Sequence, residues 1–351
     1  MPTKEEIIEK LGMKDKFIDD PKDLYCDFIS TGILAVDLAT APHRGGGGIP
    51  RGRLIELFGP YQSGKTTLAL SIVREFQRQN LDVTIFEPEN SYNPEYAKIF
   101  GVDNKKITFN QDNVGEDVFD AIEAFVANNV TDLILLDSLP ALSSTEILTS
   151  DMKDDDVASD ARMNAKAWKK LKGLLNRTNT TLLMINQMRD KPGVMYGKSE
   201  TTPGGRAKNF WCDMRIRVRA KKPFYKGSKE SKEKYGHTVE VVIEKNKLGR
   251  SGKRAWFDLY YDKGIDKGKD IKKVGIKIGV IERSGNWLKF IYEDEDEEIE
   301  IHENGKDNFF EAIRNHEKSK QIFKQIKEKV KGHFTKNNKE DKKTDAKNET
   351  N

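Results

Sequence analysis

The chain has 351 residues, of which 34% are charged and 36% hydrophobic, and its formal net charge is +4. No stretch approaches the roughly 18 to 20 apolar residues that a membrane span needs, and the N-terminus lacks the apolar run of a secretory signal. We therefore expect no membrane association, no metal cluster, and a reducing cytoplasm in which Cys26 and Cys212 stay free thiols.

The first 30 residues predict a short helical arm and a linker. After them, strand-like apolar runs alternate with helical patterns, and the runs are Leu54–Phe58, Val83–Glu87, Leu133–Asp137 and Leu182–Asn186. Val118, Ile122 and Val126 have the spacing of one helix face. This alternation predicts an α/β fold, in which a mostly parallel twisted sheet has helices on both faces.

Past Phe210 the apolar residues alternate with period two. Three further runs predict strands that extend the same sheet in antiparallel orientation, namely Met214–Arg219, Thr238–Glu244 and Lys253–Tyr260. Beyond about Ile265 we expect a small α+β module that ends near Phe334. Its basic run Lys318–Lys331 is either a solvated helix face or a surface for duplex DNA.

These patterns divide the chain into four expected parts. Residues 1–30 form an arm for oligomerisation, 31–265 a nucleotide-binding core and 266–334 the small C-terminal domain. Residues 335–351 have no apolar side chain except one alanine, so we expect a disordered tail.

A glycine-rich sequence separates the strand at 54–58 from a helical pattern. G-x-x-x-x-G-K-T in this context is the P-loop, whose backbone amides surround phosphate oxygens at the positive end of a helix dipole. Lys65 is expected to reach the β- and γ-phosphates, and the Thr66 hydroxyl to bind Mg²⁺. The sequence thus predicts a nucleoside triphosphate site that includes Gly59, Pro60, Tyr61, Gln62, Ser63, Gly64, Lys65, Thr66 and Thr67.

Three polar residues follow the other strand-like runs. Asp137 ends a run about 70 residues after the P-loop, which is the Walker B pattern of an acid that orients Mg²⁺. Glu89 is either placed to polarise a water that attacks the γ-phosphate or is a surface glutamate on a loop. Gln187 can hydrogen-bond the γ-phosphate and report its presence to the segment that follows.

That segment, Met188–Lys208, has four glycines, two prolines and five basic residues. Loops this long inside a compact domain are usually functional or disordered. Basic side chains mixed with Val194 and Met195 suit a grip on a phosphate backbone. A second stretch, Ser150–Val157, precedes a basic helical segment, so the sequence predicts ATP-gated binding of a polymer.

The chain resembles the bacterial RecA recombinase family from about residue 25 to about residue 330. The resemblance runs in order through GIPRGRLIELFGPYQSGKTTLAL, EPENSYNPEYAKIFGVD, LILLDSLPAL, ARMNAKAWKKL, INQMRDKPGVMYGKSETTPGGRAKNF, EKNK and KVGIKIGVIERSGNWLKF. It implies a RecA-like P-loop NTPase core with ATP and Mg²⁺ as cofactors. It also implies a DNA-dependent ATPase that forms a helical filament of identical subunits on single-stranded DNA and exchanges strands with homologous double-stranded DNA.

The same resemblance implies a biological setting. Members act in DNA recombination, DNA repair and the SOS response to DNA damage. A nucleoid-associated position in the cytoplasm is implied, with single-strand-binding and loader proteins as further partners.

Residue roles follow from the resemblance as well. Glu89 matches the catalytic glutamate, Gln187 the γ-phosphate sensor and Asp137 the Walker B acid. Two tyrosines match positions that pack near the adenine, namely Tyr96 and Tyr261.

Further positions match groups that act beyond the subunit's own nucleotide. Lys245 and Lys247 match lysines that reach the ATP of the neighbouring subunit and complete its catalytic site. DNA contacts are implied for Arg162, Lys169, Arg189, Lys191, Pro192, Gly193, Val194, Met195, Thr201, Gly204, Gly205 and Arg206.

The sequence departs from the family pattern at several of these places. Asn93 stands where an aspartate usually lies beside the base, and Pro192 replaces a branched apolar wedge and donates no backbone hydrogen bond. Arg206 replaces an asparagine, and this extra cation should increase the salt sensitivity of DNA binding.

Two other functions are compatible with the motifs. A hexameric helicase would share the phosphate machinery but act as a closed ring. A DNA-binding filament protein could use ATP as an assembly switch without significant hydrolysis, although Glu89 has no purpose in such a switch.

Overall fold

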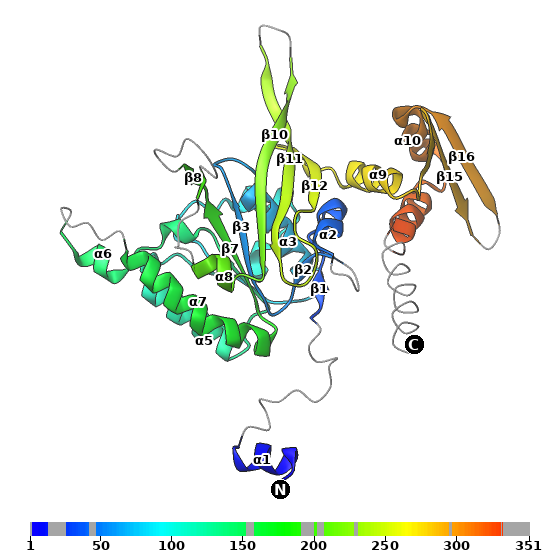
Figure 1. The fold of residues 1–351 in the computed structure, drawn as a ribbon. Helices are drawn as coiled ribbons and strands as arrows, with labels where there is room; N and C mark the ends of the chain where they lie inside the picture. The colour runs from blue at the N-terminus through cyan, green and yellow to red at the C-terminus, as the bar shows by residue number, and fades with distance from the viewer. Residues whose placement is uncertain are drawn as a thin grey trace.

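The computed structural model describes residues 2–12, 26–41, 47–151, 158–190, 200–201, 207–227, 231–294, 297–330 and 332. Its centre is a nine-stranded sheet (Figure 1). In spatial order the strands are β13 (Gly264–Ile265), β12 (Arg254–Tyr260), β11 (Glu233–Asn246), β10 (Met214–Lys226), β3 (Leu54–Gly59), β7 (Thr181–Gln187), β6 (Leu133–Leu136), β4 (Val83–Phe86) and β5 (Ile107–Asn110).

The sheet is parallel from β10 to β5 and antiparallel from β10 to β13. The expectation that all three late strands are antiparallel is therefore wrong for β10, whose Met214 lies opposite Ile55 of the parallel strand β3. The reason is the long connection after β7. A parallel crossover needs a dozen or more residues, and residues 188–213 provide them, whereas only six residues, 227–232, separate β10 from β11.

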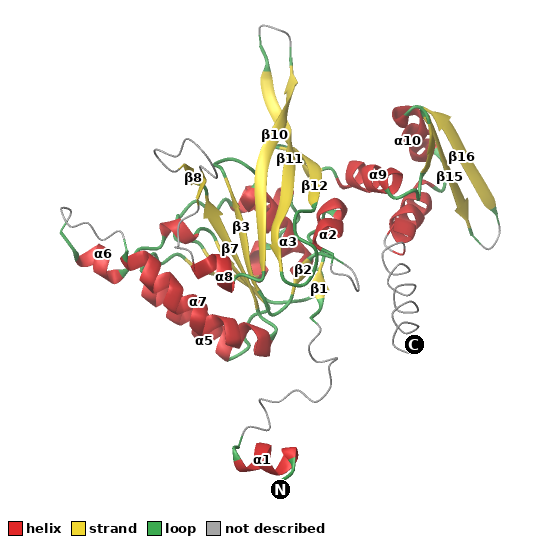
Figure 2. Ribbon diagram, in the orientation of Figure 1, coloured by secondary structure: helices red, strands yellow, loops and turns green. Residues whose placement is uncertain are grey.

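Helices cover both faces of the sheet, as predicted (Figure 2). One core joins α2 (Leu34–Thr40), α3 (Lys65–Gln77) and α4 (Pro94–Ile99) to side chains such as Ile55 and Leu57. The other joins α5 (Gly115–Ala127) and α7 (Ser159–Thr178) to Leu54 and Leu182. Successive residues of β3 thus enter different cores, which follows from the two-residue period of a strand.

Shorter elements connect this framework. The arm contains α1 (Lys4–Lys10), which begins with a capping box between Thr3 and Glu6. The remaining short elements are β1 (Phe28–Ile29), β2 (Ile49–Pro50), η3 (Asn104–Lys106), η4 (Leu139–Ala141), α6 (Thr145–Thr149), β8 (Arg189–Asp190), β9 (Glu200–Thr201) and α8 (Ala207–Trp211). Among the described residues, no helix is long and apolar enough to cross a membrane.

The C-terminal residues form helices and an antiparallel sheet around a further core, which also includes Leu34 of α2. These elements are α9 (Lys267–Lys277), the antiparallel strands β14 (Glu282–Ser284), β15 (Trp287–Glu293) and β16 (Glu298–Asn304), α10 (Lys306–Asn315), and a helix over 319–330. Lys318, at the start of the basic run, forms ion pairs with Asp294 and Glu297. The predicted tail, 335–351, lies outside the described residues.

Candidate functional site

The P-loop has the conformation that its sequence predicts. β3 ends at Gly59, and α3 begins at Lys65 with Gly64 as its N-cap residue. Gly64 has φ 95°, a left-handed conformation that favours glycine. At Gly59, a β-carbon would lie 2.0 Å from the carbonyl oxygen of Val218 in β10. Both glycines are therefore required where the sequence places them.

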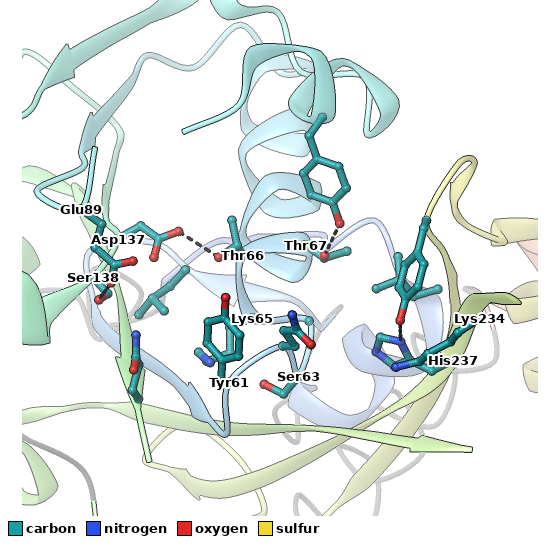
Figure 3. A pocket seen from close by; sticks show the side chains of 17 residues that line it. Tyr61, Ser63, Lys65, Thr66, Thr67, Glu89, Asp137, Ser138, Lys234 and His237 are labelled. Atoms are coloured by element: carbon teal, nitrogen blue, oxygen red, sulfur yellow. Dashed lines mark hydrogen bonds between the residues drawn. The ribbon is translucent and has the colours of Figure 1, made fainter. Parts of the chain in front are cut away.

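The loop borders a cavity of about 520 Å³ (Figure 3). It is walled by residues from β7, β11 and β12 as well as by α3. Twelve of the predicted nucleotide and catalytic residues line it: Tyr61, Gln62, Ser63, Gly64, Lys65, Thr66, Thr67, Glu89, Tyr96, Asp137, Gln187 and Tyr261. The fold thus brings together residues that are up to about 200 positions apart in sequence.

Two side chains at the centre of the loop suit phosphate oxygens. The Lys65 ammonium is buried and donates to the carbonyl oxygens of Gly59 (3.2 Å) and Pro60 (2.7 Å). Burial lowers the Lys65 pKa, and the nearby Asp137 and Glu89 carboxylates oppose this shift. The Ser63 hydroxyl is buried and has no hydrogen-bond partner among the described residues. An anionic acceptor would satisfy both groups.

Oxygen ligands for a metal lie beside the lysine. The Thr66 hydroxyl donates to Asp137 Oδ2 at 3.0 Å. The Asp137 pKa is raised to about 7, chiefly by burial; the Glu89 and Glu87 carboxylates also raise it, while the Thr66 hydrogen bond and Lys65 lower it. A hydroxyl and one or two carboxylates match the few protein ligands that Mg²⁺ takes when phosphates supply the others. The residues present therefore fit Mg²⁺ bound together with a triphosphate.

Glu89 projects into the same cavity and accepts a hydrogen bond from the Ser138 hydroxyl. Gln187 ends β7 next to Gly59, which is its partner in the parallel register with β3. The Met188 amide, one residue later, donates to the Gly59 carbonyl at 3.1 Å. The possible general base and the possible phosphate sensor thus lie on different strands around one site.

The other end of the cavity is aromatic. Tyr96 Oη lies 3.0 Å from Thr67 Oγ1, and Tyr261 Oη lies 3.1 Å from His237 Nδ1. Asn93, which replaces the usual aspartate, caps α4 by accepting a hydrogen bond from the Tyr96 amide. Two flat tyrosine rings and apolar walls suit a nucleobase.

Sequence reasoning missed several residues of this cavity, namely Ser138, Ile185, Lys234, His237 and Leu259. His237 is 3% exposed, and burial and the nearby Lys234 lower its pKa. No motif marks these residues. The placement of Lys234, His237 and Leu259 depends on the pairing of β11 and β12, which the sequence pattern did not specify, whereas Ile185 lies on β7 and Ser138 directly follows Asp137.

Lys245 and Lys247 do not line the cavity of their own chain. Lys245 donates to the carbonyl oxygens of Asn209 (2.7 Å) and Phe210 (3.1 Å). Since β11 rises about 3.3 Å per residue, Lys245 lies about 25 Å along the strand from His237. The lysines thus lie at the far end of β11 from His237, which lines the cavity.

Most of the predicted DNA contacts fall outside the described residues: Lys191, Pro192, Gly193, Val194, Met195, Gly204, Gly205 and Arg206. The backbones of Arg189 and Thr201 pair as the strands β8 and β9. Arg162 and Lys169 are exposed on α7, where Arg162 forms an ion pair with Glu146 at 3.0 Å. Residues 152–157 of the second predicted loop are also outside the described part.

Comparisons with known proteins agree with the geometry of the cavity. A family model described as the RecA N-terminal domain matches residues 6–266. Protein RecA of Aquifex aeolicus (strain VF5) is 40% identical over 262 residues, which are 75% of this chain and 74% of the relative. Protein RecA of Clostridium acetobutylicum is 37% identical over 283 residues, or 81% of this chain and 77% of the relative. The chain therefore belongs to the RecA family of recombinases, DNA-dependent ATPases that polymerise on DNA and promote strand exchange.

Proposed function

We propose that the cavity hydrolyses ATP by in-line attack of water on the γ-phosphate, and that its nucleotide state controls the grip on DNA. The observation that supports this is the convergence of Lys65, Thr66, Glu89, Asp137 and Gln187 on one cavity. Each has a chemical type that phosphoryl transfer uses, namely a cation, a hydroxyl, two carboxylates and an amide.

The side chains divide the task. Lys65 exchanges its two carbonyl partners for phosphate oxygens, which are stronger acceptors because they are charged. Thr66 and Asp137 hold Mg²⁺, which when bound neutralises charge on the phosphates. Ser138 orients the Glu89 carboxylate, and Glu89 positions the attacking water and accepts its proton.

The response to DNA arises around β7. Gln187 hydrogen-bonds the γ-phosphate and thereby orders the segment from Met188 to Thr202, which grips single-stranded DNA. Arg162 and Lys169 extend the contact along α7, together with the other DNA residues predicted from the sequence. Hydrolysis removes the γ-phosphate and releases the grip.

The catalytic site is completed by a second subunit. Lys245 and Lys247 do not line the cavity of their own chain, and in the filament they serve the site of the adjacent subunit. There they stabilise the charge that develops in the transition state. Hydrolysis then depends on assembly of the filament.

The wider setting follows from the same function. The arm, residues 1–30, links subunits. The ATPase core consists of residues 31–265, the small C-terminal domain of residues 266–334, and the tail of residues 335–351. The polymer is single-stranded DNA, which is paired with homologous duplex in the cytoplasm at the nucleoid. Single-strand-binding and loader proteins are the further partners.

The test is phosphate release from ATP with and without single-stranded DNA, for the natural chain and for Glu89→Gln. We expect strong DNA stimulation that Glu89→Gln removes while DNA binding in ATP persists. Glu311→Gln, which changes an exposed glutamate of α10, serves as the control. Absence of stimulation at every protein concentration would contradict the proposal and favour an assembly switch. Closed rings in electron microscopy would favour the helicase alternative.

A further inference from the structure

One buried nitrogen in the wall of the nucleotide cavity has no hydrogen-bond partner among the described residues. It is Nε2 of His237, a side chain that lines the cavity and is 3% exposed. A buried polar atom that stays unpaired destabilises a protein, and a ligand that pairs with it gains the whole hydrogen bond. Because the imidazole forms part of the cavity wall, a ligand in the cavity can supply that bond.

The imidazole is held in place by its strand and by a tyrosine. His237 lies opposite Pro223 of β10 and opposite Leu259 of β12, so its backbone is paired on both sides within the sheet. Its Nδ1 atom lies 3.1 Å from the Tyr261 hydroxyl, and the two rings meet edge to face with centroids 5.7 Å apart. One ring nitrogen is therefore engaged with the protein, and Nε2 is the nitrogen that remains for a ligand.

His237 lies beside the phosphate loop and away from the carboxylates. Two residues farther along the same face of β11, Val239 Cγ2 lies 3.3 Å from the position that a β-carbon on Gly64 would take. Two strand residues span about 7 Å, so His237 is a short distance from the start of α3. Glu89 lies on the opposite side of the cavity, with Lys65 between the two (Figure 3). A triphosphate that extends from the loop toward Glu89 would therefore have its sugar on the His237 side.

The chemistry of the histidine and tyrosine suits a hydroxyl group. Burial and the nearby Lys234 ammonium lower the His237 pKa, so the imidazole is neutral at neutral pH and supplies no charge to a phosphate. A neutral imidazole and a phenol can each donate or accept, and a change of the His237 tautomer reverses both roles. A nucleobase edge has fixed donors and acceptors, whereas a sugar hydroxyl both donates and accepts. The hydroxyl therefore fits either tautomer.

We propose that His237 recognises the sugar of the nucleotide, with Nε2 hydrogen-bonded to the 2′- or 3′-hydroxyl while Tyr261 holds Nδ1. The inference rests on the proposed function for the position of the phosphates. Lys234 lies over the Tyr261 ring, 5.7 Å from its centroid, and supports this arrangement from the solvent side. A site built to pair with a hydroxyl disfavours an analogue that lacks it, because its own polar atom then stays unpaired.

The quantity to measure is the sugar factor, defined as the Kd of a deoxy analogue of ADP divided by the Kd of ADP. Calorimetric titrations with 2′-deoxy-ADP and 3′-deoxy-ADP give the two factors, and diphosphates exclude any contribution from hydrolysis or from the γ-phosphate. We expect one of the two factors to be at least about 5 in the natural chain, which corresponds to one net hydrogen bond. Inosine diphosphate, which keeps the sugar and changes the base, should bind His237→Asn and the natural chain with the same preference relative to ADP.

Two substitutions distinguish the two ring nitrogens. An asparagine amide reaches about as far as Nδ1 of the histidine, and a glutamine amide about as far as Nε2. His237→Asn should therefore keep a partner for Tyr261 but lower the sugar factor to about 1, whereas His237→Gln should retain most of it. Thr238→Val is the matched control, because Thr238 is on the other face of β11 and donates to Asp258 Oδ1 at 2.9 Å. Its sugar factors should equal those of the natural chain.

Each outcome decides for or against the sugar contact. Two sugar factors of about 1 in the natural chain overturn the inference, whether or not any variant folds. A sugar factor that persists in His237→Asn, with ADP and its deoxy analogues weakened equally, shows a purely structural residue and overturns it as well. If His237→Asn does not fold, His237→Phe takes its place with the same expected loss. A preference between ADP and inosine diphosphate that disappears in His237→Asn places Nε2 against the base and also overturns it. A natural chain that binds no ADP would instead contradict the proposed function.

Discussion

Replacement of Lys65 by methionine separates nucleotide binding from folding. Methionine preserves the length and apolar stem of the lysine but removes the ammonium. Among the described residues, the hydrogen-bond acceptors of that ammonium are the loop carbonyls of Gly59 and Pro60. The Gly59 carbonyl keeps the Met188 amide as a donor in the variant. The fold therefore loses little when the charge is removed.

The expected magnitudes differ sharply for folding and for binding. Burial already disfavours the charged lysine, as its lowered pKa shows, so the free energy of unfolding should change by no more than about 1 kcal/mol. Hydrogen bonds to charged groups contribute about 1.5–3 kcal/mol each. Two such bonds to phosphate oxygens amount to about 3 kcal/mol or more, so ATP affinity should fall at least about 100-fold.

Thermal melts with and without Mg-ATP measure both quantities. A ligand at 100 times its Kd stabilises the folded state by about 2.7 kcal/mol, so the natural chain should melt at a higher temperature with ATP. Lys65→Met should melt as the natural chain does without ATP and gain almost nothing from it. Lys98→Met, which removes an exposed lysine paired with Glu95 at 2.7 Å, should respond to ATP normally. An affinity for ATP within threefold of the natural value in Lys65→Met would refute the reasoning.

Three further outcomes follow from the structure. Burial raises the Asp137 pKa to about 7 in the metal-free site, so protons compete with Mg²⁺ for the carboxylate; the Mg²⁺ concentration needed for half-maximal hydrolysis should rise as pH falls from 8 to 6, and Asp137→Asn should weaken the Mg²⁺ dependence at every pH. Asp270→Ala removes the carboxylate of α9 that accepts hydrogen bonds of 2.5 and 3.2 Å from the first two amides of α2, so urea denaturation should show a loss of about 1–3 kcal/mol. A chain with Lys245→Ala and Lys247→Ala should bind ATP but not hydrolyse it, and mixing it with Glu89→Gln should restore part of the phosphate release; mixtures without activity would contradict catalysis across subunits.

Local chemistry explains why the phosphate end of the site could be predicted. A P-loop needs glycines, a lysine and a hydroxyl within eight residues, so the phosphate site can be recognised from the short segment Gly59 to Thr66 alone. Asp137 and Gln187 follow apolar runs whose parallel pairing was evident, and parallel strands end at the same edge of a sheet. Position on a strand end was enough to bring them to the cavity.

The aromatic end required information that no single segment carries. His237 and Lys234 enter the cavity because β11 pairs with β10, and β10 pairs in parallel with β3. Alternation identified β10 and β11 as strands but could not specify their partners, and it missed the direction of β10. The role of Glu56 could not be predicted from the sequence for a similar reason. In sequence it is one polar residue inside an apolar run, and only its hydrogen bonds with Asn186 and Arg215 show why it is there.

The two ends of β11 lie at different functional positions. Its first half brings His237 against Tyr261 in the nucleotide cavity of its own subunit, while its end presents Lys245 about 25 Å away. A strand is stiff along its length, and β11 is paired with β10 over its whole length and with β12 from Gly236 to Val242. Under the proposed assignment, one strand would therefore touch the nucleoside of one ATP and, at its other end, the phosphates of the next. Successive nucleotides along the filament would then be joined by a rigid element, so occupancy of one site would affect its neighbour without a change in fold.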